Sequence, residues 1–137
     1  MGLTLDSSVV IAAERRGDTP TQLVRQIVSA VCEDQLAIAS VALTELVHGI
    51  FRATYPQVRS RREAFINELL TDIEVVPYTQ STAFLAGRID GEQRTIGVTI
   101  PSLDLLIGAT ALEIGYGVLT ANVRHFQLIP GLKIVTL

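Results

Sequence analysis

The sequence contains no tryptophan, one cysteine and one lysine, and it lacks the run of about 18 apolar residues that a membrane-spanning helix needs. The single cysteine, Cys32, excludes an internal disulfide and suits a reducing cytoplasm. Because Cys32 follows Ile27, Val28 and Val31 at helical spacing, we expect its thiol to pack in the core. The first residues lack the charged segment of a signal peptide, so we expect a cytoplasmic protein.

Charged residues are also few. They make up 18% of the 137 residues, whereas 48% are hydrophobic, and the net charge of −3 lacks the basic excess typical of nucleic-acid-binding domains. Ten of the eleven basic residues are nevertheless arginine, which favours phosphate recognition; the alternative is a GC-rich genome that encodes arginine in place of lysine. The arginines gather at Arg15 and Arg16 and at Arg59, Arg61 and Arg62, with single ones at Arg52 and Arg124.

Short apolar segments alternate with helical patterns along the chain. The patterns predict strands at residues 3–5, 36–39, 74–76, 118–120 and 133–136. They predict helices at 9–15, 21–33, 41–54, 58–71, 79–94 and 102–114, and a short helix or turn at 122–126. Ser7 or Ser8 is expected to cap the first helix and Ser102 the sixth. The alternation predicts one domain over residues 1–137, of class α/β, with a central parallel sheet of four to five strands between helices.

Three isolated acidic residues stand at or near the starts of helices. Asp6 ends the first strand, Glu45 lies one and a half turns into the helix after the second strand, and Asp104 heads a helix that is apolar on nearly all sides. Burying such a carboxylate costs several kcal/mol, of which a helix N-terminus offsets only about 1 kcal/mol. No lysine or arginine lies near Asp104 in the sequence, so a bound divalent cation is the natural compensating charge.

In parallel α/β sheets, ligands collect at the carboxyl ends of the strands, where Asp6 and Asn122 fall. Oxygen ligands without paired histidine or cysteine favour Mg²⁺ or Mn²⁺ over zinc. Such an ion can polarise a phosphodiester and lower the pKa of an attacking water. The sequence therefore predicts that Asp6, Glu45 and Asp104 converge on one cation and that the chemistry is metal-dependent phosphodiester hydrolysis.

Each of these residues also has a plainer interpretation. Asp6 can serve only as a helix cap, Glu45 as a solvated surface residue, and Asn122 as a turn or cap residue. Gly49, one turn beyond Glu45, leaves room for a ligand to approach that face. The remaining titratable residues that we considered are expected to be solvated or partly packed: His48, His125, Asp90 and Glu92.

The motifs, taken in order, resemble those of the PIN-domain ribonucleases, and in particular the VapC-type toxins of bacterial toxin–antitoxin modules. The resemblance covers residues 3 to 136. It rests on Asp6-Ser7-Ser8 after the first strand, Thr44-Glu45-Leu46 with Gly49, Asp104-Leu105-Leu106-Ile107 leading into ATALEIG, and LTANVRHF followed by GLKIV.

The resemblance implies a three-layer α/β/α PIN-like fold, Mg²⁺ or Mn²⁺ held by clustered acids, endonucleolytic cleavage of RNA, a homodimer, and neutralisation by a cognate antitoxin. By position, Asp6, Glu45 and Asp104 match the three principal acids, and Asn122 stands at the fourth acidic position and removes one charge. Asp6 and Asp104 are then the expected direct metal ligands, with Glu45 acting through water. Asn122 and Thr120 would bond a ligand water or phosphate, and the RNA backbone would meet Arg124 and, more loosely, Arg15, Arg16 and Arg52.

Three rival functions are weaker. A phosphorylatable receiver domain needs paired acids after the first strand, but Ser7 follows Asp6, and Pro77 ends the third strand. An aspartate-nucleophile phosphatase needs a second aspartate where this chain has Ser8. A PIN-fold binding module without catalysis remains an alternative, although three retained acids in an apolar setting argue against it.

The chain carries more apolar residues around its third and fourth helices than a core alone should need: Val47, Ile50, Phe51, Phe65, Ile66 and Leu69. These helices are expected to form a hairpin whose groove receives an amphipathic or extended segment of the antitoxin, with its basic end directed at the three acids. A symmetric dimer is expected independently. The alternative is that these side chains only fill the core.

Overall fold

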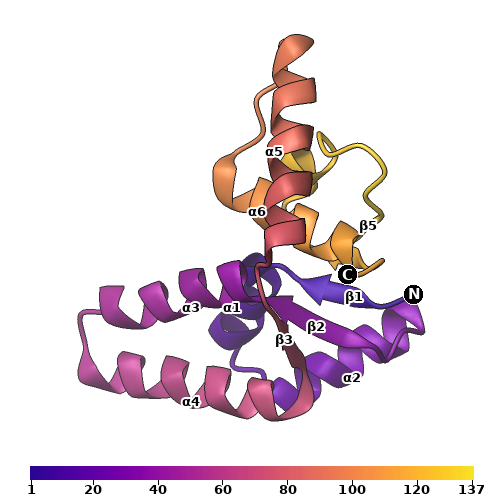
Figure 1. Ribbon diagram of the computed structural model, residues 1–137. Coiled ribbons are helices and arrows are strands. Elements are labelled where there is room, and N and C mark those ends of the chain that lie inside the picture. Colours follow the sequence, from indigo (N-terminus) through magenta and orange to yellow (C-terminus); the bar gives the residue numbers. More distant parts are fainter.

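Strands and helices alternate along the chain, as the sequence pattern predicts. A computed structural model describes residues 1–137 and contains five strands and seven helices (Figure 1). In chain order they are β1 Leu3–Leu5, α1 Ser7–Arg16, α2 Pro20–Val31, β2 Leu36–Ala39, α3 Ser40–Arg52, α4 Pro56–Asp72, β3 Glu74–Val76, α5 Gln80–Thr95, α6 Ser102–Glu113, β4 Gly117–Leu119, α7 Val123–Phe126 and β5 Ile134–Val135. None of the helices combines the length and apolar character that crossing a bilayer requires.

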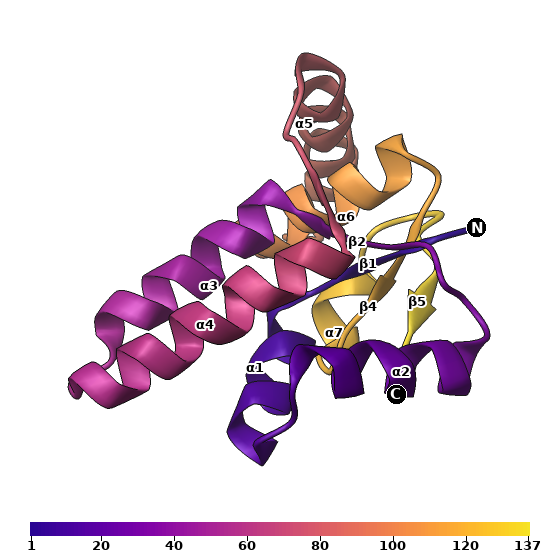
Figure 2. The same cartoon turned by 90° about the horizontal axis from the view of Figure 1, so that it is seen from below.

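The five strands form one parallel sheet in the order β3-β2-β1-β4-β5. Leu5 of β1 is in register with Ile38 of β2 on one side and with Leu119 of β4 on the other. Figure 2 shows α1 and α2 on one side of the sheet and α5 and α6 on the other. The α/β/α expectation is confirmed. The strand order also makes β1 the point where successive strands change from one side of the sheet to the other, which is where such folds bind ligands.

The helix α6 is buried as expected. Six of its residues lie in the interior: Leu105, Ile107, Gly108, Ala109, Thr110 and Ala111. Strands β1, β2 and β4 are buried at every position, because helices cover both of their faces. The apolar centre of the molecule therefore lies directly beneath the carboxyl ends of β1 and β4.

Several local expectations are wrong. The N-cap positions of α1 and α6 are Asp6 and Pro101, so the serines expected as caps lie inside the helices. Helix α4 begins at Pro56, two residues earlier than expected, because proline is well suited to a first helical turn. Cys32 is exposed: α2 ends at Val31, and Cys32 takes a left-handed conformation with φ 54°, which turns it off the apolar face of the helix.

Helices α3 and α4 run side by side as the expected hairpin (Figures 1 and 2). Of the six apolar side chains attributed to a partner surface, four are buried in the core: Ile50, Phe65, Ile66 and Leu69. For these four, the core-filling alternative is therefore correct. Only Val47 and Phe51 are exposed, at 40% and 69%.

The cluster Arg59, Arg61 and Arg62 holds this hairpin in place. Arg59 donates to the carbonyl oxygen of Ala53 at 2.7 Å, and Arg62 donates to that of Gly49 at 2.6 Å. Arg61 forms an ion pair of 2.8 Å with Glu14 of α1. Positive side chains at the end of a helix stabilise its last carbonyl groups. These three arginines therefore have structural partners and are not free phosphate ligands.

The packing of α6 yields a stability prediction. A Cβ atom added to Gly108 would lie 2.3 Å from Cδ1 of Ile129, which is itself only 2% exposed and cannot move aside into solvent. Gly108→Val should therefore lower the free energy of unfolding by about 2–3 kcal/mol. The control is Gly91→Val in α5, where an added Cβ meets nothing within 4 Å; it should change stability by less than about 0.5 kcal/mol. Urea denaturation measures both, and equal effects would contradict the tight packing of α6.

Candidate functional site

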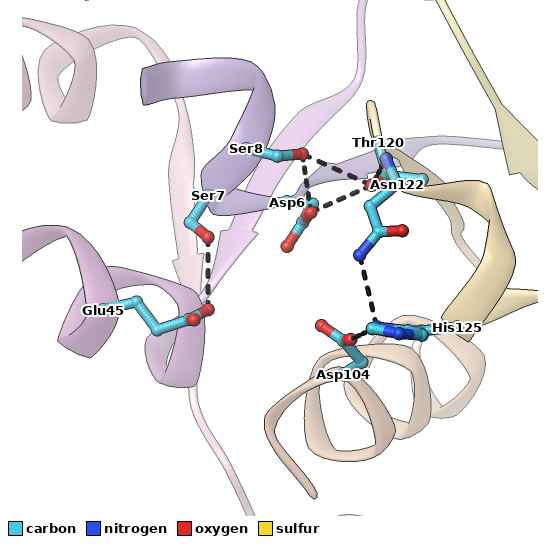
Figure 3. Close-up of polar contacts among 8 residues, drawn as sticks. All are labelled: Asp6, Ser7, Ser8, Glu45, Asp104, Thr120, Asn122 and His125. Atoms are coloured by element: carbon cyan, nitrogen blue, oxygen red, sulfur yellow. Dashed lines mark hydrogen bonds and ion pairs between the residues drawn. The ribbon is translucent and has the colours of Figure 1, made fainter. Parts of the chain in front are cut away.

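The sequence-predicted acids gather at the carboxyl end of β1. Asp6 directly follows this strand, Glu45 comes from α3, and Asp104 lies in the first turn of α6. Figure 3 shows the three carboxylates facing one space, with Asn122 and His125 at its other side. Three segments distant in sequence thus supply negative charge to one region.

Asp6 occupies the N-cap position of α1, but its side chain caps nothing. Its Oδ2 atom accepts hydrogen bonds from the hydroxyl groups of Ser8 at 2.7 Å and Thr120 at 2.9 Å. Those hydroxyls in turn accept from backbone N–H groups of Ala121 at 3.1 Å and Asn122 at 2.9 Å. Asp6 is only 4% exposed and forms no ion pair with a basic side chain. A simple capping role is therefore excluded.

Glu45 is half-buried and points toward the other acids, so it is not a solvated surface residue. Its Oε1 atom accepts a hydrogen bond of 3.2 Å from the hydroxyl of Ser7. Burial raises the pKa of Glu45; the Ser7 bond opposes this shift, and repulsion from Asp6 and Asp104 adds to it. The site therefore disfavours the ionised form of Glu45 when no cation is present.

Asp104 is held by a residue to which the sequence assigned no role. Nδ1 of His125 lies 2.7 Å from Oδ2 of Asp104 and 3.2 Å from the amide nitrogen of Asn122. Burial raises the pKa of Asp104, the His125 hydrogen bond lowers it, and repulsion from Asp6 raises it further. The one available signal for His125 was its position three residues after Asn122, on the same turn of a short helix.

One pattern is common to the three acids. In each carboxylate, one oxygen is bound to a protein group, and the other accepts no hydrogen bond from the protein. The unbound atoms are Oδ1 of Asp6, Oε2 of Glu45 and Oδ1 of Asp104. Unpaired oxygens that face one space, without a lysine or arginine among them, are chemically suited to a hard divalent cation.

The spacing differs from the sequence expectation. No group of three or more aspartate, glutamate, histidine or cysteine side chains is arranged to hold a metal ion directly. The three acids repel one another, and each is attached to its own partner, Ser7, Ser8 with Thr120, or His125. The prediction of three carboxylates within a single coordination sphere is therefore not met by this geometry.

The remaining candidates are dispersed. Thr120 is 1% exposed, and its hydroxyl bonds Asp6. Arg16 is paired with Asp18 at 2.8 Å. Asp90 and Glu92 lie inside α5 rather than in a frayed loop, and they pair with Arg94 and Arg88. The exposed arginines without a protein partner that the sequence singled out are Arg15, Arg52 and Arg124.

A hollow of about 460 Å³ adjoins the acids. It lies between α1, α3 and α4, which we call the α1–α3–α4 hollow, and it includes Glu45 at the end near the site. The sequence predicted a groove between the arms of the hairpin; the hollow also needs α1. Gly49 lines it with open space where a Cβ would stand, as expected. Phe51 does not line it, because Phe51 lies on the opposite side of α3.

The raised pKa of Glu45 yields a second prediction. Its folded-state pKa exceeds the ordinary value of 4.5, so its contribution to stability is fullest below pH 4.5 and is lost as the pH rises through the folded-state pKa. In EDTA, Glu45→Gln should therefore raise the melting temperature at pH 7 by about 2–4 °C and leave it nearly unchanged at pH 4. The exposed Glu63→Gln is the control. Calorimetry at both pH values is the measurement, and a gain that does not depend on pH would refute the cause given.

Comparisons with known proteins agree with this architecture. A model of the PIN domain matches residues 3–132. Ribonuclease VapC1 of Rickettsia felis is 33% identical over 136 residues, which are 99% of this chain and 96% of that protein.

Two solved structures have the same fold. VapBC2 from Rickettsia felis, bound to a DNA fragment from its promoter, matches with a TM-score of 0.85 at 21% identity, over 100% of this chain and 99% of the other. VapBC-5 from Mycobacterium tuberculosis, a member of the VapBC family of toxin–antitoxin systems, matches with a TM-score of 0.75 at 24% identity, over 100% and 98%. From the extent of the family match and the identity to a full-length relative, the chain belongs to the PIN-domain family, on its VapC branch.

Proposed function

We propose that the protein is a metal-dependent endoribonuclease that acts as the toxin of a toxin–antitoxin pair. The observation that carries this proposal is the set of three carboxylates that face one space, each with one oxygen unbound (Figure 3). The similar protein VapC1 of Rickettsia felis is named a ribonuclease, which supports the nuclease part of the proposal.

Asp6 and Asp104 would hold the cation, Mg²⁺ or Mn²⁺, through their unbound oxygens, and Glu45 would act through a water molecule. When bound, such a cation polarises the phosphodiester and lowers the pKa of the attacking water. The chain's own residues supply orientation. Ser8 and Thr120 fix Asp6, and Ser7 fixes Glu45. We therefore assign Thr120 to holding Asp6 rather than to the substrate.

The residues at the rim of the site would meet the RNA. The amide of Asn122 is exposed beside the acids and can donate to a phosphate oxygen or to a ligand water. Arg124 is exposed in α7, directly after Asn122 and Val123, and has no protein partner, so it can pair with a phosphate. Such groups can position the phosphate and stabilise the charge that develops on it during cleavage.

The partner that we propose is an antitoxin protein, since a structural match belongs to the toxin–antitoxin systems. A basic group of the antitoxin, placed among Asp6, Glu45 and Asp104, would supply the positive charge that these acids lack. We also propose a homodimer. Val47 and Phe51 form an exposed apolar strip on α3, facing away from the α1–α3–α4 hollow, that a second copy could cover.

The central test removes one charge from the site. Asp104→Asn removes a negative charge that would hold the cation, so it should lower the rate of RNA cleavage by about 100-fold or more. The substitution keeps the shape of the side chain, so the protein should remain folded. Asp90→Asn is the matched control, because this half-buried carboxylate of α5 pairs with Arg94 rather than with the site, and it should cleave like the unmodified protein. Cleavage of a labelled RNA with Mg²⁺ and with EDTA is the measurement. Full activity of Asp104→Asn, or full activity in EDTA, would sink the proposal.

A further test concerns His125, which we propose as a positioning residue for Asp104. His125→Phe keeps a ring but loses the donor, and it should weaken Mn²⁺ binding by about 10-fold or more. His125→Asn places an amide donor near the Nδ1 position and should restore most of the affinity. His48→Phe is the control, because His48 is exposed on α3 and bonds none of the three acids. Titration calorimetry gives the affinities, and equal loss in both His125 variants would exclude the hydrogen bond as the cause.

A further inference from the structure

Six of the ten arginines are held by protein partners. Arg16, Arg61, Arg88 and Arg94 form ion pairs with carboxylates, and Arg59 and Arg62 bond backbone carbonyl groups. The other four have no ion pair and no hydrogen bond to the protein: Arg15, Arg25, Arg52 and Arg124. An exposed arginine without a partner is available to an external anion.

Two of the four unpaired arginines line the α1–α3–α4 hollow. Arg15 comes from α1 and Arg52 from the last turn of α3. The two acids of the hollow do not cancel them. Glu14 is already paired with Arg61, and Glu45 belongs to the acidic site at the inner end. Away from Glu45, the unpaired charge of the hollow is therefore positive.

The hollow also carries an aromatic platform. Tyr55 lines it from the turn between α3 and α4 and is 67% exposed. Half of the lining residues are hydrophobic, among them Ile11 and Val58. Free arginines beside an exposed aromatic ring are the combination by which proteins bind single-stranded nucleic acid: phosphates pair with the cations, and bases stack on the ring.

We infer that the α1–α3–α4 hollow binds a single-stranded segment of the RNA and leads it to the acids, an inference that rests on the proposed function. Arg15 and Arg52 contact phosphates, and a base stacks on Tyr55. Glu45 connects the two regions, since it lines the hollow and also belongs to the acidic site. A hollow of about 460 Å³ between three helices admits nucleotides of one strand. A duplex carries its phosphates on the outside and its bases paired inside, so it would leave the floor of the hollow uncovered.

The test measures RNA binding apart from cleavage. The full chain in EDTA is titrated against a short, fluorescein-labelled single-stranded RNA, and fluorescence anisotropy gives Kd at several salt concentrations. The double variant Arg15→Gln and Arg52→Gln should weaken binding about 10-fold or more and make the slope of log K against log salt shallower by about 1.4, or about 0.7 for each lost phosphate contact. Tyr55→Leu should weaken binding by about 10-fold without changing the slope.

The chain offers a matched control in Arg25, which is exposed and unpaired in α2 but does not line the hollow. Arg25→Gln should leave Kd and slope within twofold of the unmodified protein. Arg15→Lys with Arg52→Lys keeps both charges and should retain most of the salt dependence, which separates lost phosphate contacts from misfolding; circular dichroism checks the fold of every variant.

The outcomes separate the two proposals. If the unmodified chain neither binds nor cleaves RNA, the proposed function itself fails. If it binds RNA and the double glutamine variant binds equally well, the function stands and the hollow is not the RNA site. If that variant keeps its RNA affinity but loses affinity for an antitoxin, the hollow is a protein-binding surface, and the inference is overturned.

Discussion

The structure depends on placing a carboxylate at the end of the central strand without a basic side chain beside it. Asp6 is almost fully buried, and two hydroxyl groups replace the water that its carboxylate loses. Backbone N–H groups orient these hydroxyls. Hydrogen bonds of this kind offset the loss of water around a buried polar group. They engage only one of the two oxygens of Asp6, so the other oxygen remains available to a ligand.

The other two acids accept fewer hydrogen bonds than Asp6. Glu45 and Asp104 each have one hydrogen-bonding partner and a raised pKa, caused first by burial. The fold thus accepts repulsion among three acids at the carboxyl end of β1, where successive strands change from one side of the sheet to the other. Repulsion kept in a folded protein in this way is typical of sites whose geometry serves a ligand rather than stability.

The hydrophobic pattern was enough to predict every strand and helix, because strands β1, β2 and β4 are mostly apolar and α6 is apolar on nearly all sides. The same sequence reasoning selected Asp6, Glu45 and Asp104. It missed His125, since contact with Asp104 depends on how α7 packs against α6. It left open the role of Arg59, Arg61 and Arg62, because their partners lie across a tertiary interface. The predicted capping role of Ser7 or Ser8 was also wrong, because their hydroxyl groups bond Glu45 and Asp6 instead of the helix end.

Three of the hydrogen bonds around Asp6 join residues that are 112 to 114 positions apart in the chain. A chain emerging from the ribosome contains Asp6 early, but Thr120 follows only 114 residues later, and His125 later still. Until then, Asp104 lacks its hydrogen bond to His125, and Asp6 has only one of its two hydroxyl partners, Ser8. The acidic site can therefore be completed only after residue 125 has been synthesised and α7 has packed against α6.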